Sequence, residues 1–245
     1  MWRMNKLNII ILCYLIIGSC QVYACEQPDE SKLEEYSSVF RNIDPEGNIG
    51  SNMNGHAIDL YFKDKVKYED VINELFLIAA HMGDKGGQYN RGRRLVEGDG
   101  IKANLKAGRC WLEMAANQNN TQSLYYLGKL DFRENEGIAK ERASGYYKKA
   151  ADLGYSPAMC SLGLSYLKGE GVEKDFEQAI LYMEKSVKAG NQICATNLIL
   201  IYTEGLEVTK DYCEAIKWIS YPFDTSSVSE ERINLIRENA QLCEK

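Results

Sequence analysis

Cysteine is the residue type in this chain with the clearest chemistry. Of its eight cysteines, Cys13 lies in an apolar segment that we expect to be removed, and Cys20 is either removed with it or carries a lipid. An even number of cysteines in an oxidising compartment indicates disulfide bonds, although six cysteines allow 15 sets of pairs. The cysteines that stay in the folded protein are Cys25, Cys110, Cys160, Cys194, Cys213 and Cys243.

The other candidates for chemistry form no recognisable site. No two cysteines have Cys-x-x-Cys spacing, and His56 and His81 are the only histidines, so we expect no metal centre. Neither histidine has an identifiable nucleophile to activate. The turns Gly98-Asp-Gly100 and Gly169-Glu-Gly171 lack the Gly-Lys-Ser/Thr ending of a phosphate loop. The sequence therefore predicts no catalytic residue, no cofactor and no metal, and a protein that is not an enzyme.

The first 24 residues have the pattern of an export signal. Two basic residues precede an uncharged apolar run, Leu7 to Ile17, which is too short to span a bilayer. Cleavage after Ala24 would leave Cys25 at the new N-terminus. The sequence Ile17-Gly-Ser-Cys20 resembles a bacterial lipobox, and processing there would leave a lipid-bearing Cys20. We expect a periplasmic or secreted protein, with a membrane-anchored lipoprotein as the alternative.

The chain is acidic. Its 29 basic and 35 acidic residues give a net charge of −6, and loss of Arg3 and Lys6 with the export signal would leave it near −8. Binding to nucleic acid needs clustered Lys and Arg that neutralise phosphates, so nucleic acid is not an expected ligand. The charge favours a basic protein as the partner. We expect the chain to be a monomer.

The middle of the chain repeats itself with a period of 35 or 36 residues, which brings Gly92 to Gly128 and then to Gly163. Small pairs follow the same period, from Ala79-Ala80 onward. A fixed period in this range indicates stacked helical hairpins, each of which buries its apolar face against its neighbours. The expected units are residues 48–83, 84–119, 120–154, 155–190 and 191–221.

The elements at both ends of this stack are also predicted. Residues 25–47 form a lead-in helix and loop, and turn-forming residues extend this loop as far as Gly55. Asp175 and Asp211 precede the second helices of their hairpins, where a carboxylate caps exposed amides. Residues 222–245 contain an amphipathic closing helix that covers the end of the stack.

A motif recurs in these units and is sharpest at residues 155–190. It consists of Leu162-Gly163, Tyr166, Gly169-Glu-Gly171-Val172, Asp175, Ala179 and Tyr182. The motif resembles the Sel1-like repeat, a relative of the tetratricopeptide repeat. The resemblance implies an all-α, right-handed solenoid of about five hairpins with a closing helix, and a role in protein–protein contacts, often in bacterial envelopes.

The resemblance also implies a binding face. In tetratricopeptide-like hairpins, positions at fixed distances from the glycine of the first helix line a concave groove. Tyr and Arg are residue types that often anchor interfaces. The alternative is that these side chains belong partly to the core or only solvate the face. The residues at these positions are Tyr89, Arg93, Tyr125, Lys129, Phe132 and Leu164.

The predicted stack bears on the disulfides. Some exported members of the family form disulfides at regular positions along the repeats. In this chain the residues at those positions are not cysteine. Cys213 lies at the start of the second helix of the last hairpin, and Cys243 lies at the end of an antiparallel closing helix. These two cysteines should therefore meet. By elimination Cys25 pairs with Cys110, and Cys160 with Cys194, although the connectivity of these four stays open.

Three functions remain on this reading. The first is a protein-interaction module of the bacterial envelope, such as an immunity or adaptor protein that binds one partner in its groove. The second is an enzyme or binding protein for cell-wall fragments or β-lactams. The third is a secreted factor that acts on host proteins.

Overall fold

The computed structural model describes Cys25, Ser31, Glu34, Glu35, Ser38, residues 48–134, 136–206, 208–220 and 228–241, and Cys243. The predicted export signal, both of its processing sites and most of the lead-in segment 25–47 lie outside the described residues. The described part of the chain forms eleven helices and no strand. In order they are α4 (Ile49–Asp64), α5 (Glu69–His81), α6 (Lys85–Glu97), α7 (Leu105–Asn117), α8 (Thr121–Arg133), α9 (Gly137–Asp152), α10 (Ser156–Lys168), α11 (Phe176–Lys188), α12 (Gln192–Glu204), α13 (Tyr212–Ile219) and α14 (Glu230–Ala240).

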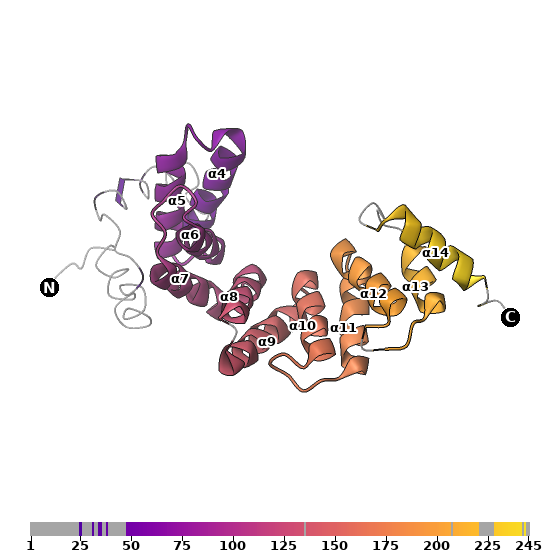
Figure 1. Ribbon diagram of the computed structural model, residues 1–245. Helices are drawn as coiled ribbons and strands as arrows, with labels where there is room; N and C mark the ends of the chain where they lie inside the picture. The colour runs from indigo at the N-terminus through magenta and orange to yellow at the C-terminus, as the bar shows by residue number, and fades with distance from the viewer. Residues whose placement is uncertain are drawn as a thin grey trace. The chain divides into compact units, whose positions relative to one another are not determined.

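The chain divides into two compact units, residues 1–127 and 128–245, and the boundary falls within α8. In each unit successive helices pack side by side as hairpins (Figure 1). None of the described helices combines the length and the apolar character that a membrane-spanning helix requires.

In the unit of residues 1–127, two glycines let the helices of a hairpin touch. A Cβ atom built on Gly92 of α6 would lie 2.9 Å from the carbonyl oxygen of Gly108 on α7, and one on Gly108 would lie 2.8 Å from that of Gly92. Any larger side chain would force the helices apart. Asp84 and Asn104 cap α6 and α7, since their side chains accept hydrogen bonds from the amides of Gly87 and Ala107.

The first hairpin corrects the expected loop. Helix α4 begins at Ile49, so residues 49–55 are helical rather than part of a turn-rich loop. Asn48 caps the helix, because its side-chain oxygen accepts a hydrogen bond from the amide of Ser51 at 3.2 Å. Gly50 packs closely, since a Cβ atom there would lie 3.1 Å from the side chains of Met82 and Asp84. Tertiary packing and a cap outweigh the low helix propensity of this segment.

In the unit of residues 128–245, the predicted caps are confirmed. Asp175 accepts a hydrogen bond from the amide of Gln178 at the start of α11, and Asp211 accepts one from the amide of Glu214 at the start of α13, both at 2.9 Å. A Cβ atom on Gly163 would lie 2.9 Å from the carbonyl oxygen of Ala179, so α10 and α11 also meet backbone to backbone. Helix α14 packs its buried face against this unit.

Three disulfides lie in the described part of the chain. One joins Cys25 to Cys110 of α7, with their Cα atoms 5.4 Å apart. The others join Cys160 of α10 to Cys194 of α12 and Cys213 of α13 to Cys243, with Cα separations of 5.6 and 5.7 Å. These separations suit unstrained backbones on both sides of each bond. Each disulfide lies within one unit.

Candidate functional site: the faces of the first helices

The residues predicted for a binding face are placed in each unit by itself. In residues 1–127, Tyr89 and Arg93 lie one turn apart on α6, and Tyr125 lies on α8. All three side chains are half-buried. Burial raises the pKa of the Tyr89 hydroxyl, and the nearby charge of Arg93 opposes this shift. Tyr89 therefore stays uncharged, and part of its ring is already shielded from water before a partner binds.

Arg93 is held by carboxylates of its own chain. Its guanidinium donates a hydrogen bond to Glu97, one turn later on α6, and lies 3.5 Å from Asp99. Burial alone would lower the pKa of Arg93, but the charges of Glu97 and Asp99 raise it. The Tyr126 hydroxyl donates to the second oxygen of Glu97 at 2.8 Å and links α8 to α6.

Sequence reasoning therefore missed Glu97 and Tyr126, although Tyr126 directly follows a predicted residue. The position rule selects Tyr125 and does not select the adjacent Tyr126, whose hydroxyl contacts Glu97. A binding partner would meet Arg93 with its charge already compensated.

Next to this face is a buried ion cluster. Arg94 is fully buried, and its guanidinium pairs with Glu69 and lies 3.3 Å from Asp99. Its Nε atom donates to Asn73 at 3.0 Å. Lys65 also pairs with Asp99. The hydrogen bond that Lys65 donates to Asp99 raises the pKa of Lys65. Burial opposes the charge of Asp99, but the hydrogen bond from Lys65 and the nearby guanidinium charges lower the pKa of this carboxyl.

In residues 128–245, the predicted residues do not come together as one cluster. The Phe132 ring on α8 lies 5.6 Å from the ammonium of Lys140 on α9. Lys129 is half-buried on the same helix as Phe132. Leu164 of α10 packs against the hydrophobic core of this unit, together with Tyr166. Phe132 is thus the aromatic residue among those predicted in this unit, and its ring lies beside a charged group.

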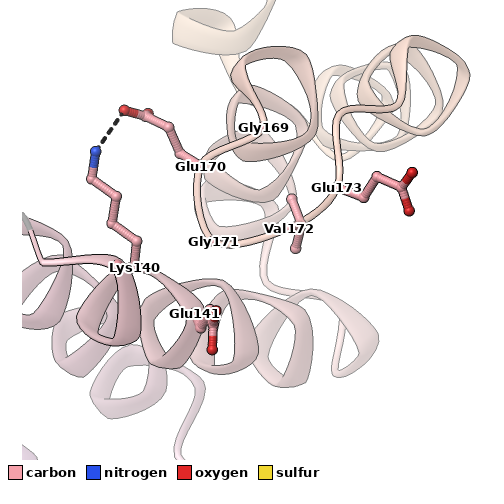
Figure 2. A pocket seen from close by; sticks show the side chains of 8 residues that line it. Lys140, Glu141, Gly169, Glu170, Gly171, Val172 and Glu173 are labelled. Carbon is pink, nitrogen blue, oxygen red and sulfur yellow. Dashed lines mark hydrogen bonds and ion pairs between the residues drawn. The ribbon is translucent and has the colours of Figure 1, made fainter.

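An open hollow of about 440 Å³ lies where the turn after α10 meets the start of α9 (Figure 2). The Lys140 ammonium and the Glu170 carboxylate reach toward each other there and pair at 3.0 Å, whereas Glu173 extends away. Ser144 donates to the carbonyl oxygen of Glu170 at 2.9 Å. The hollow is lined by Gly137, Lys140, Glu141, Gly169, Glu170, Gly171, Val172 and Glu173.

The hollow is a joint between hairpins, and the other unit contains its equivalent. There, Asn73 of α5 donates to the carbonyl oxygen of Gly100 at 2.8 Å, as Ser144 of α9 does to Glu170. Each joint contains an ion pair within the chain, Arg94 with Asp99 at one and Lys140 with Glu170 at the other. This recurrence explains the hollow as a product of repeat packing rather than as a reaction site.

The histidines do not add a reaction centre. His81 ends α5, and its buried ring meets Trp111 edge-on with centroids 4.9 Å apart. His56 lies on the exposed face of α4. The sequence also contains Ser165-Tyr-Leu-Lys168, the Ser-x-x-Lys spacing of β-lactam-reactive proteins. Ser165 is only 2% exposed within α10, so a substrate has no path to its hydroxyl. Among the described residues, no three His, Cys, Asp or Glu side chains are arranged to hold a metal ion.

Comparison with known protein families identifies these hairpins. A model of the Sel1 repeat matches residues 86–120, 121–155, 156–191 and 195–220, which is more than half of the chain. The chain belongs to the Sel1 repeat family. Sel1 repeats are modules for protein–protein interaction and are generally not catalytic. The matches begin at α6, so the hairpin of α4 and α5, expected as a first unit at 48–83, precedes them.

Two solved structures resemble the chain. One is a protective antigen of uropathogenic Escherichia coli strains with an SLR fold, at 26% identity and a TM-score of 0.71, covering 83% of this chain and 44% of that one. The other is a Sel1 repeat protein from Oxalobacter formigenes, at 25% identity and a TM-score of 0.61, covering 77% and 76% of the two chains. With the helical hairpins, these neighbours confirm the predicted all-α solenoid class.

A curated relative matches a shorter stretch. It is DAP3-binding cell death enhancer 1 of Rattus norvegicus, which is 32% identical over 81 residues. The match takes in 33% of this chain and spans 16% of the relative's length. The similarity is therefore confined to a short part of a much longer protein.

Proposed function

We propose that this protein is an exported interaction module, of the adaptor or immunity type, that binds one protein partner through the first helices of its hairpins. The observation that carries the proposal is the run of four Sel1 repeats between residues 86 and 220. Repeats of this family act by binding proteins, and stacked hairpins supply an extended surface for a partner.

The anchors we assign are aromatic. Tyr89 on α6 and Tyr125 on α8 belong to one unit, and Phe132 belongs to the other. Half-buried aromatic side chains are good anchors, because they add contact area while losing little conformational freedom on binding. Arg93 contributes less in this proposal, since a partner must compete with Glu97 and Asp99 for its guanidinium.

Export is the second part of the proposal. The apolar run from Leu7 to Ile17 is of secretory length. Three disulfides suit an oxidising compartment, because cytosolic thiols are kept reduced. In such a compartment the bonds hold the stacked helices together where the polypeptide is exposed to proteases. The acidic net charge favours a basic partner.

A specific observation favours a second candidate, a secreted factor that acts on host proteins. The chain is similar over 83% of its length to a protective antigen of uropathogenic bacteria. Both candidates use the same binding face and differ in whether the partner comes from the producing cell or from a host.

The test is affinity capture with the exported, oxidised protein, from envelope and secreted fractions of the producing cell and from a host extract. We expect one stoichiometric protein that is retained by the parent chain and lost from the double variant Tyr89→Ala/Tyr125→Ala. A second variant, Asp70→Ala/Lys149→Ala, changes exposed residues of the second helices α5 and α9 and serves as the matched control. It should retain the partner.

The origin of the captured protein separates the two candidates. A basic, toxic partner from the producing cell supports the immunity role, and a host protein supports the secreted factor. Retention that is the same for both double variants contradicts the assigned face. Capture of cell-wall fragments in place of protein contradicts the interaction-module proposal itself.

A further inference from the structure

Two turns of the unit formed by residues 1–127 expose large apolar side chains. Phe62, in the last turn of α4, and Val66, between α4 and α5, are 82% and 88% exposed. Leu105 is the first residue of α7, directly after the turn between α6 and α7, and is 59% exposed. Side chains exposed to this degree protrude from the surface. Apolar side chains that are exposed in neighbouring turns are candidates for contact with a partner or a membrane.

Both turns lie at one edge of the unit. Lys65, in the first turn, pairs with Asp99 in the second. Asn73 near the start of α5 donates to the carbonyl oxygen of Gly100 at 2.8 Å. The two turns therefore lie in contact, and we name residues 62–67 and 102–106 the basic edge.

The charge of this edge is opposite to that of the whole chain. Residues 60–68 contain three lysines and one aspartate, and residues 98–106 contain two lysines and one aspartate, Asp99, which pairs with Lys65. The chain as a whole has a net charge of −6. The lysines whose side chains are exposed are Lys63, Lys67, Lys102 and Lys106.

The corresponding turns of the other unit differ. Residues 169–177 contain four acidic residues and one lysine, and residues 204–214 repeat this ratio. Repeat packing therefore does not require a basic turn. The positive charge is a local property of the basic edge, placed beside protruding apolar side chains.

Aromatic rings lie at the base of the first turn. The ammonium groups of Lys63 and Lys67 are 5.9 and 5.1 Å from the centroid of the Tyr68 ring. The Lys65 ammonium is 5.3 Å from that of Tyr61. Tyrosine flanked by lysine, with an apolar side chain beyond it, is the composition of segments that lie in the headgroup region of a bilayer.

We propose that the basic edge docks on the surface of an anionic phospholipid bilayer. The lysines contact headgroup phosphates, and Phe62 and Val66 enter the boundary between headgroups and acyl chains. Neutral and anionic lipids share the apolar boundary, so the charge of the headgroups decides binding. This contact leaves the first-helix residues Tyr89 and Tyr125 to the protein partner, so the two activities are separable.

The experiment measures co-sedimentation of the exported, processed, oxidised protein with lipid vesicles. One set of vesicles contains phosphatidylcholine alone, and in the other about a third of the lipid is phosphatidylglycerol. We expect binding to the anionic set that is at least about tenfold tighter and that weakens as salt is added. An N-terminal acyl chain would enter both sets, so the ratio between the two isolates the basic edge.

Two variants of the edge are compared with two matched controls, and all of the replaced side chains are exposed. We expect each edge variant to lower anionic-vesicle binding by about tenfold or more, and each control to change it by less than about twofold. Circular dichroism verifies that all four fold. The edge variants are Phe62→Ala/Val66→Ala and Lys63→Gln/Lys67→Gln/Lys102→Gln/Lys106→Gln. The controls are Ile138→Ala and Lys168→Gln/Lys174→Gln/Lys188→Gln/Lys210→Gln.

Three results would overturn the proposal. The first is equal binding to neutral and anionic vesicles. The second is a loss of binding in the controls as large as in the edge variants. The third is tight binding of soluble polyglutamate by the edge with no vesicle binding, which would make its ligand an acidic polypeptide.

Discussion

Replacing Gly163 with alanine tests the close helix contact on which each hairpin depends. The new Cβ atom would lie 2.5 Å from Cγ of Met183 and 2.9 Å from the carbonyl oxygen of Ala179. The Met183 side chain can shift, but the Ala179 carbonyl belongs to the backbone of α11 and cannot do so without moving the helix. Alanine gains about 1 kcal/mol of helix propensity over glycine. Overpacking costs about 1–3 kcal/mol, so we expect a net loss of up to about 2 kcal/mol.

Gly145 provides the matched control. It also lies inside a helix of the same unit, α9, but a Cβ atom there meets nothing within 4 Å. Gly145→Ala should therefore stabilise the protein by about 0.5–1 kcal/mol. Urea unfolding followed by circular dichroism measures both variants. A Gly163→Ala protein as stable as Gly145→Ala would refute the reasoning, because helix propensity alone would then account for both.

Three further predictions concern the disulfides, the ion cluster and the caps. Replacing Cys160 and Cys194 together with alanine should lower the unfolding free energy by about 2–4 kcal/mol, measured by urea unfolding, because the bond closes a long loop in the unfolded chain; an unchanged midpoint would contradict this. The pKa of Asp99 is lower in the folded state than in the unfolded one. Asp99 therefore stabilises the folded protein above its unfolded pKa, about pH 4, and this stabilisation is lost as pH falls through the folded pKa. Melting temperatures measured across this range should therefore fall less steeply for Asp99→Asn than for the parent, and parallel curves would count against the cluster. Asp175→Ala should cost about 1 kcal/mol in thermal or urea unfolding, because the amide of Gln178 loses its acceptor, and Asp175→Asn should restore most of it.

The repeat architecture was predictable because its requirements fall on residue types that are easy to recognise. Gly92 and Gly163 recur where helix backbones touch, and the small pairs recur where helices are buried. Asp175 and Asp211 precede helices that need a cap. These local signals repeat along the chain, so each supports the others.

Contacts between residues that lie far apart in the sequence were harder to predict. Helix α4 begins inside a segment rich in turn formers because Asn48 caps it and Gly50 packs against Met82 and Asp84. Arg94 is fully buried between the carboxylates of Glu69 and Asp99, whereas its sequence neighbour Arg93 is half-buried. A linear sequence does not reveal which of two adjacent arginines the core encloses.

The binding face was predictable only as a set of positions. Repeat geometry selects Tyr89 and Tyr125, but the hydrogen bond from Tyr126 to Glu97 depends on how α6 and α8 pack. Leu164 satisfies the same position rule and packs against the core. Periodicity places a residue on a helix face, whereas the neighbours that cover the face decide how much of its side chain a partner can reach.

The most direct test of the interaction proposal is photo-crosslinking from single positions in the exported, oxidised protein. A photoreactive residue replaces Tyr89 or Phe132 on the first helices, or, as controls, Asp70 or Lys149 on the second helices. We predict that the first two positions cross-link to one and the same protein and that the controls do not. Cross-links confined to the control positions, or none from any of the four, would contradict binding of a protein through the first helices of the repeats.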